Sequence, residues 1–428
     1  MNLRLLIIVL LLLLVTSEPL VTYSDNSDVE FLVAGNVRIT NRLSEGRHSE
    51  QSERLFSSFM RRWEIAGASV AVAVDGRLVF ARGFGYADTE VPVPAEPYHR
   101  FRIASVSKLV TAVAVMKLCE DGRMSLSDKV FGEGGLLNDT LYTNPKDKRV
   151  YGITVAHLLG HQGGWTSRYG DHMFITMTIA KQMGRELPLS TQDYIRFALD
   201  RNLHFTPGTG RAYSNLGYAI LGEVVAGVSG MSYEEYCRKE LFEPLGIHDM
   251  ALGKNLETER LLNEVKYYEH EASIPKFSVY GTKELVPASY GGNDIESLGG
   301  AGGWIATAPD LMRLLLAIDG LDDVPDILSQ ESISRMTDNS NGYAPLGWKS
   351  AYGNGVWWRT GFFPGSTAMA KRLPSGVSWV VLLNTSAWNG PELTNDINTL
   401  MSRVLMQVKE WPDVDLFRYS LPVPLGDY

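Results

Sequence analysis

A serine and a lysine stand three positions apart in the stretch FRIASVSKLVTAVAVMKL, residues 101–118. Residues at i and i+3 are neighbours on one helical face, so Ser105 and Lys108 would lie side by side. A lysine that burial and nearby cations keep neutral can accept the proton of a serine hydroxyl. A backbone N–H in the first helical turn lacks a partner in the helix and can donate to an oxyanion. The pair therefore predicts a nucleophile and its base.

The same residues also fit the solvent-exposed first turn of an ordinary core helix. An apolar stripe typical of core packing follows the serine: Val106, Leu109, Val110, Val113 and Met116. The spacing also recurs from Ser273 to Lys276, where Pro275 disfavours a helix. The four-residue pattern alone leaves both interpretations open.

Further along the chain, FTPGTGRAYSNLGYAILGEVV places Tyr213 and Asn215 between a glycine-rich turn and a helix. The phenol can relay the proton of a serine, and the amide can hold a substrate carbonyl. Tyr-x-Asn also occurs at Tyr142 and Tyr352, but only the copy at 213 lies between a loop and a helix. The alternative is a tyrosine that simply packs at a helix start.

A third stretch, WWRTGFFPGSTAMAKRL, has Arg359, Thr360 and Gly361 closing a short predicted strand. Glycine in a strand lets another backbone or a ligand approach closely. The N–H of Phe362 is then a candidate second oxyanion donor. An edge strand followed by a turn fits the same residues.

The elements that must position these residues are strands at both ends of the chain and helices in its middle. Residues 70–80 alternate around an Asp-Gly turn and residues 367–384 around Pro-Ser-Gly, which predicts two hairpins. Helical periodicity marks residues 55–63, 106–118, 310–319 and 396–409, among others. We expect an α+β fold, with an antiparallel sheet from both chain ends flanked by helices and an inserted all-helical subdomain at about 105–300.

The chain begins with features of an export signal. A short basic segment precedes an unbroken apolar run from Leu5 to Val15, which is shorter than the roughly 20 residues that cross a bilayer. Small residues at Val15-Thr16-Ser17 then suit a cleavage site. We therefore expect a periplasmic or extracellular protein with membrane contact only if this segment stays uncleaved. The expected parts are a signal peptide (1–17), an N-terminal arm (18–50), a catalytic domain (51–410) and a C-terminal tail (411–428).

Composition narrows the partners. The 428 residues are 45% hydrophobic and 21% charged with a formal net charge of −9, which argues against nucleic acid as a partner. Cys119 and Cys237 are the two cysteines, and we expect buried thiols, with a disulfide as the alternative. His157 and His161 stand at i and i+4 without an H-E-x-x-H motif, so a structural role is favoured. No metal or other cofactor is expected.

Ser-x-x-Lys, then Tyr-x-Asn, then x-Thr-Gly on a late strand resembles the serine β-lactamase and penicillin-binding protein superfamily. The surrounding segments resemble its class C branch, which includes esterases, D,D-carboxypeptidases and D-aminopeptidases. The similar segments run in the family's order between residues 55 and 408, and include ITVAHLLGHQGG, LFEPLGIHDM and GGAGGWIATAPDLMRLL.

The resemblance implies a role for each candidate. Ser105 would be the acylated nucleophile, and Lys108 with Tyr213 would handle its proton. Asn215 would orient the substrate. The backbone N–H groups of Ser105 and Phe362 would form the oxyanion hole, and Thr360 would line the far wall.

Arg359 departs from the family pattern, which usually has Lys or His there. An arginine stays charged and can bind a carboxylate in bidentate fashion, or form a structural ion pair. The GHQGG segment, a milder departure, is expected in a loop beside the site. We expect a serine hydrolase (a D,D-peptidase, β-lactamase or esterase) acting on small-molecule or peptide amides or esters, including carboxylate-bearing ones. The alternative is a penicillin-recognising or peptidoglycan-binding protein with little turnover. Specificity is expected in residues 165–174 and 264–293.

Overall fold

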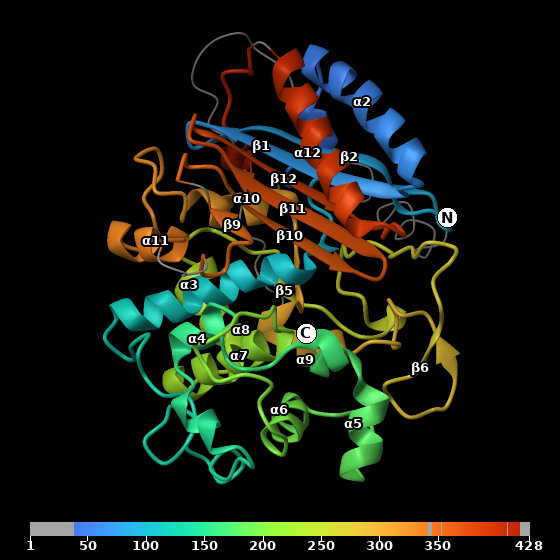
Figure 1. The fold of residues 1–428 in the computed structure, drawn as a ribbon. Helices are drawn as coiled ribbons and strands as arrows, with labels where there is room; N and C mark the ends of the chain where they lie inside the picture. The colour runs from blue at the N-terminus through green and yellow to red at the C-terminus, as the bar shows by residue number, and fades with distance from the viewer. Residues whose placement is uncertain (1–37, 341–344, 352, 409, 420–428) are drawn as a thin grey trace, which may run out of the picture. The chain divides into compact units, whose positions relative to one another are not determined.

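The central element of the fold is a sheet of seven strands in the order β3-β2-β1-β12-β11-β10-β9 (Figure 1). The computed structural model describes residues 38–340, 345–351, 353–408 and 410–419, which belong to one unit by their contacts. All neighbouring strands of this sheet run antiparallel. The strands are β1 (Gly67–Val74), β2 (Arg77–Asp88), β3 (Val93–Pro94), β9 (Ser350–Ala351), β10 (Trp357–Phe363), β11 (Ser366–Arg372) and β12 (Val377–Leu383).

Both predicted hairpins are present in the sheet. Asp75 and Gly76 join β1 to β2 with φ of 49° and 74°, which suits the turn type that matches strand twist. The second hairpin joins β11 to β12. Strand β1 pairs with β12, with Val70 opposite Val381, so the two ends of the chain meet in the middle of the sheet. The expected α+β fold with an antiparallel sheet from both chain ends is confirmed.

Helices cover both faces of the sheet. Helices α2 (Arg47–Trp63) and α12 (Gly390–Gln407) pack together on one face, and α10 (Ala308–Leu316) packs on β1 and β12 from the other (Figure 1). The bounds of all three helices differ from the expected ones. Helix α2 begins inside the expected arm (18–50), and α12 begins before residue 396 because Asn389 caps it and Pro391 occupies its first turn. Helix α10 ends before the expected residue 319.

The middle of the chain supplies most of the remaining helices, as expected, together with short strands. The α-helices are α3 (Ser107–Glu120), α4 (Val155–Leu159), α5 (Thr176–Met183), α6 (Thr191–Leu199), α7 (Asn215–Ser229), α8 (Tyr233–Cys237), α9 (Ile295–Leu298) and the later α11 (Gln330–Thr337). The 3₁₀ and π turns are η1 (Asn41–Ser44), η2 (Ala104–Val106), η3 (Lys148–Gly152), η4 (Ser167–Tyr169), η5 (His172–Phe174), η6 (Arg238–Phe242), η7 (Glu257–Glu259), η8 (Gly299–Ala301) and η9 (Leu416–Tyr419). The short strands are β4 (Phe101–Arg102), β5 (Ala251–Leu252) and β8 (Trp304–Ala306) in one sheet, and β6 (Lys276–Phe277) with β7 (Leu285–Val286) in another.

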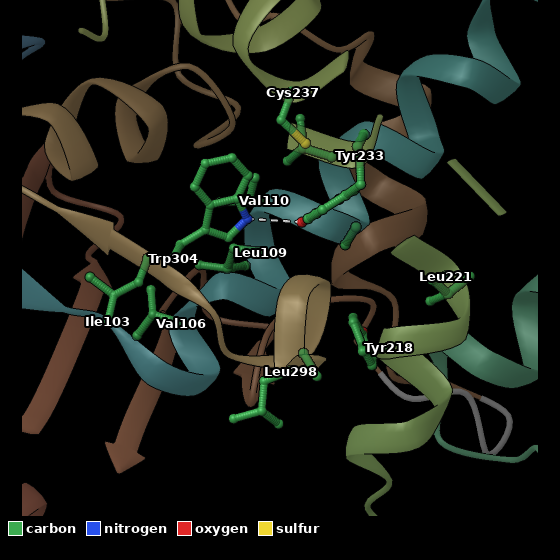
Figure 2. Packing of buried hydrophobic residues seen from close by; sticks show 14 of the residues in the cluster. Ile103, Val106, Leu109, Val110, Tyr218, Leu221, Tyr233, Cys237, Leu298 and Trp304 are labelled. Atoms are coloured by element: carbon green, nitrogen blue, oxygen red, sulfur yellow. Dashed lines mark hydrogen bonds between the residues drawn. The ribbon is translucent and has the colours of Figure 1, made fainter. Parts of the chain in front are cut away.

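Helix α3 is buried on all sides, which differs from the expected single apolar stripe. Polar Ser107, Lys108 and Thr111 are fully buried in it beside the apolar residues. The indole N–H of Trp304 donates to the Tyr233 hydroxyl at 2.9 Å next to α3 (Figure 2). This packing around the whole circumference holds the first turn of α3 in place.

The remaining expectations concern the cysteines and the chain ends. Cys119 and Cys237 are free thiols. Within the described residues, no helix is both long and apolar enough to span a membrane. The expected signal peptide and most of the expected arm lie outside the described residues. In the expected tail (411–428), η9 buries Leu416 in the core.

Candidate active site

Ser105 lies in the 3₁₀ turn η2, between β4 and the start of α3. The preceding residue, Ala104, has a φ of 45°, a left-handed conformation that costs energy for a residue with a Cβ. The surrounding core fixes this turn, because Ala104 and Val106 are both buried. The strained turn holds the Ser105 side chain at the mouth of the site, where it is partly exposed.

Lys108 is fully buried in the first turn of α3. Its Nζ donates to Ser105 Oγ at 3.2 Å, to Asn215 Oδ1 at 2.7 Å and to the backbone oxygen of Ala301. Burial lowers the pKa of this ammonium, the charge of Tyr213 raises it and Arg359 lowers it again, to about 8. The spacing of Ser105 and Lys108 thus brings them together as the sequence predicts.

Tyr213 also lies within hydrogen-bond distance of the serine hydroxyl. Its Oη is 2.7 Å from Ser105 Oγ and accepts a hydrogen bond from Arg359 Nη2 at 3.1 Å. Burial raises the pKa of the phenol, but the charges of Lys108 and Arg359 outweigh it and lower the pKa to about 8. A group with this pKa can exchange a proton with a serine hydroxyl near neutral pH.

Asn215 is the first residue of α7 and holds Lys108 rather than pointing free into the cleft. Ser214 caps this helix by accepting a hydrogen bond from the N–H of Gly217. The Asn215 amide accepts from Lys108 and donates to Asp171 Oδ2 at 2.8 Å. Sequence reasoning missed Asp171, although it named the loop 165–174 that contains it.

Arg359 points from β10 toward the nucleophile and is only 3% exposed. Its Nε donates to the backbone oxygen of Ser105 at 2.9 Å, and Nη2 donates to Tyr213. The structural ion pair that the sequence allowed for Arg359 is therefore absent from the described residues, and the guanidinium instead contacts Ser105 and Tyr213. A role in binding a substrate carboxylate stays a prediction.

Gly361 allows β10 to approach the nucleophile turn. A Cβ at this position would lie 2.1 Å from the Ile103 oxygen and 3.0 Å from the Ser105 nitrogen. Only glycine fits here, so the backbone of β10 lies directly against this turn at Gly361. The three residues 359–361 lie in the middle of β10 rather than at its end, which corrects the expected strand boundary.

A second lysine, which sequence reasoning missed, lies on the far wall. Lys349 is exposed, and its Nζ donates to Thr360 Oγ1 at 3.3 Å. It precedes the two-residue strand β9, so no periodicity in the sequence marks it. Thr360 thus accepts a hydrogen bond from a lysine ammonium group, and its role in lining the far wall of the site stays a prediction.

His161 lies beside the site and not on a helical face with His157. Its φ is 59°, its ring centroid is 4.7 Å from that of Tyr213, and its Nδ1 accepts from the N–H of Ser214. Burial, together with Arg359, Lys108 and Arg211, holds the pKa of His161 well below its usual value, so the ring is neutral. The GHQGG loop thus lies next to the site, as expected. Within the described chain, no three His, Cys, Asp or Glu side chains gather to hold a metal ion.

Comparison with known proteins identifies the family of this chain. The sequence profile of the Beta-lactamase family matches residues 53–400. Among curated proteins, Protein flp of Staphylococcus aureus (strain MRSA252) is 25% identical over 229 residues, which are 54% of this chain and 43% of that protein. Penicillin-binding protein 4* of Bacillus subtilis (strain 168) is 27% identical over 212 residues, 49% of this chain and 43% of that protein. The match spans less than half the length of these relatives.

Solved structures show the same fold. The octameric penicillin-binding protein homologue from Pyrococcus abyssi has a TM-score of 0.62 and 26% identity. This match covers 87% of the present chain and 80% of the homologue's chain. D-amino acid amidase from Ochrobactrum anthropi SV3, complexed with L-phenylalanine amide, has a TM-score of 0.65 and 22% identity. This match covers 85% of the present chain and 99% of the amidase chain. The family profile spans most of the chain, and the chain belongs to the β-lactamase family.

Proposed function

We propose that this chain is a serine hydrolase that cleaves an amide or ester through an acyl-enzyme on Ser105. One observation carries the proposal: Ser105 Oγ lies within hydrogen-bond distance of both Tyr213 Oη and Lys108 Nζ. The hydroxyl therefore contacts both a proton acceptor and a buried cation. A serine becomes nucleophilic when such a base takes its proton.

Acylation begins as the Tyr213 phenolate takes the Ser105 proton while Oγ attacks the substrate carbonyl carbon. The Lys108 ammonium keeps the phenolate stable. The resulting oxyanion accepts hydrogen bonds from the backbone N–H groups of Ser105 and Phe362. Tyr213 then returns the proton to the leaving amine or alcohol, which departs and leaves an ester on Ser105.

Deacylation uses the same groups in reverse. Tyr213, again a phenolate, takes a proton from a water molecule, and the hydroxide attacks the ester carbonyl. Collapse of the second tetrahedral intermediate breaks the bond to Ser105 Oγ, which recovers its proton from Tyr213. Arg359 contacts both the backbone of Ser105 and the phenol of Tyr213. It therefore keeps the distance between these two residues constant through both half-reactions.

Family membership supports this chemistry, and the proteins similar to this chain include a penicillin-binding protein and a D-amino acid amidase. We place the activity outside the cytoplasm, because residues 1–17 have the composition of an export signal. The substrate we propose is a small molecule or peptide, which the partly exposed Ser105 side chain can reach.

The test is turnover of 4-nitrophenyl esters and of peptide amides, together with labelling by a fluorophosphonate and by a fluorescent penicillin. Ser105→Ala is the test variant, and Ser273→Ala is its matched control because Ser273 begins the second Ser-x-x-Lys of the chain. We expect Ser105→Ala to abolish turnover and labelling, and Ser273→Ala to retain both. Equal labelling of the wild type and Ser105→Ala would refute the proposal. Labelling with a stable adduct and no turnover would replace it with a penicillin-recognising function.

A further inference from the structure

One half-buried aspartate contacts the hydrogen-bond network of the site, and the proposed mechanism does not use it. Asp171 lies in the loop between η4 and η5, directly before the buried residues His172 and Met173. Its Oδ2 accepts a hydrogen bond from Asn215 Nδ2 at 2.8 Å, and its Oδ1 accepts one from the backbone N–H of Met173 at 3.0 Å. Both carboxylate oxygens therefore have a donor.

Buried neighbours hold Asp171 in this place. The aspartate caps the 3₁₀ turn η5, which packs against α6 and α7. The His172 ring of this turn lies 6.1 Å from the Phe197 ring of α6, measured between centroids. Helix α7 begins at Asn215, so the turn and the helix that pack together carry the two partners of the hydrogen bond. The contact between Asp171 and Asn215 therefore rests on the packing of buried residues.

The carboxylate decides which way the Asn215 amide faces. An asparagine side chain has an oxygen that accepts hydrogen bonds and an NH₂ group that donates them, whereas a carboxylate only accepts. The NH₂ group therefore turns toward Asp171, and Oδ1 is left for Lys108, whose Nζ donates to it at 2.7 Å. An amide turned the other way would point its NH₂ group at the ammonium and lose both hydrogen bonds. Asp171 thus sets the acceptor that Lys108 meets.

Groups of both charge signs surround the buried ammonium of Lys108. Burial lowers its pKa most, the charge of Tyr213 raises it, that of Arg359 lowers it and that of Asp171 raises it, to about 8. His161, which the charge of Lys108 also affects, is neutral. Two buried cations close to each other are unfavourable without a negative charge. Among the main groups that act on Lys108, Asp171 is the one carboxylate.

We propose that Asp171 is a positioning residue of the hydrolase: through Asn215 it keeps Lys108 an ammonium that is directed at the nucleophile. The inference rests on the proposed function, because the mechanism needs a cation here to stabilise the Tyr213 phenolate. A lysine that is kept as an ammonium cannot take the proton of Ser105. Asp171 therefore leaves Tyr213 as the base, although its own hydrogen bond goes only as far as the Asn215 amide.

The experiment measures two pH profiles: kcat/KM for a 4-nitrophenyl ester, and the second-order rate constant of fluorophosphonate labelling, which reports the attack of the serine alone. Asp171→Asn is the test variant, because it removes the charge at nearly constant volume. Loss of a negative charge lowers the pKa of an ammonium and of a phenol alike. The midpoint of both profiles should therefore move to lower pH by about 1 pH unit. The plateau should fall about 10-fold as the Asn215 amide loses its fixed direction.

Further variants separate the charge of Asp171 from its role as the cap of η5. Asp171→Glu retains a carboxylate and should keep the midpoint near that of the wild type. The exchanged pair, Asp171→Asn with Asn215→Asp, brings the carboxylate next to Lys108 and should move the midpoint to higher pH than in the wild type. Asp139→Asn is the matched control, because exposed Asp139 also accepts a hydrogen bond from the backbone N–H two residues on, that of Leu141, at 2.7 Å. Its profiles should equal those of the wild type.

An aspartate that only caps η5 would, when replaced, lower the rates equally at every pH. An unmoved midpoint in Asp171→Asn, or a midpoint at higher pH, would therefore overturn the positioning role. Thermal unfolding shows whether each variant is folded, and if Asp171→Asn is not, a midpoint of the exchanged pair at or below that of the wild type would overturn the role instead. A failure of the proposed function looks different, because the wild type would then turn over no ester and Ser105→Ala would be labelled like the wild type.

Discussion

Replacing Arg359 should move the pH dependence of catalysis to higher pH. Its guanidinium lowers the pKa of both groups that can take the serine proton, Lys108 and Tyr213. In Arg359→Met both pKa values therefore rise. The direction of the change is the same whichever of the two groups is the base.

The magnitude follows from the distance and the starting pKa. The guanidinium is 3.1 Å from Tyr213 Oη, and a charge this close shifts a pKa by about 1–3 units. With a starting pKa of about 8, roughly one-tenth of the phenol is ionised at pH 7, and a rise of about 2 units leaves roughly one-thousandth. We expect a loss of about 100-fold in kcat/KM at pH 7 that shrinks progressively as the pH approaches 10.

The assay is the pH profile of kcat/KM from pH 5 to 10.5 for a 4-nitrophenyl ester, corrected for spontaneous hydrolysis. Arg359→Lys, which retains the positive charge, should keep its midpoint nearer to that of the wild type. Arg211→Met is the control, because Arg211 is exposed and acts on the pKa of His161 but is not among the main groups that shift the pKa of Tyr213 or Lys108. A uniform loss at every pH in Arg359→Met, with an unmoved midpoint, would refute the reasoning.

Two further substitutions test the packing that supports the site. Gly361→Ala places a methyl group 2.1 Å from a backbone oxygen of the nucleophile turn, so β10 must move and the Phe362 amide with it. We expect a loss of about 100-fold in kcat, the effect of removing one oxyanion donor, and wild-type kcat would contradict the proposed hole. Trp304→Phe removes the hydrogen bond to Tyr233 beside α3 and should lower the free energy of unfolding by about 1–3 kcal/mol in urea titration. An unchanged free energy of unfolding would show that the hydrogen bond from Trp304 to Tyr233 makes no net contribution to stability.

Local patterns explain how much of this molecule can be predicted from its sequence. The Ser105–Lys108 pair lies within one helical turn, and the hairpin at Asp75–Gly76 depends on two adjacent residues. Tyr213 is placed by a loop that leads directly into the cap of α7. In each case the information is contained in a few neighbouring residues, so spacing and turn chemistry are sufficient.

The residues that were missed act across long sequence separations. Asp171 reaches the site only because α7 brings Asn215 to its loop, and Lys349 only because β9 pairs with β10. His161 looks like a continuation of α4, but its positive φ turns the chain after Gly160. Arg359 could not be assigned because burial, which decides its role, has no signal in a three-residue motif.

The central claim is that Ser105 carries the acyl group, and mass spectrometry of the trapped adduct tests it most directly. The protein is incubated with a penicillin or a fluorophosphonate, quenched in acid, digested and mapped by tandem mass spectrometry. The account predicts one added mass, on Ser105 in the peptide that contains the η2 turn, and none in Ser105→Ala. An adduct on another residue, or an adduct that persists in Ser105→Ala, would contradict it.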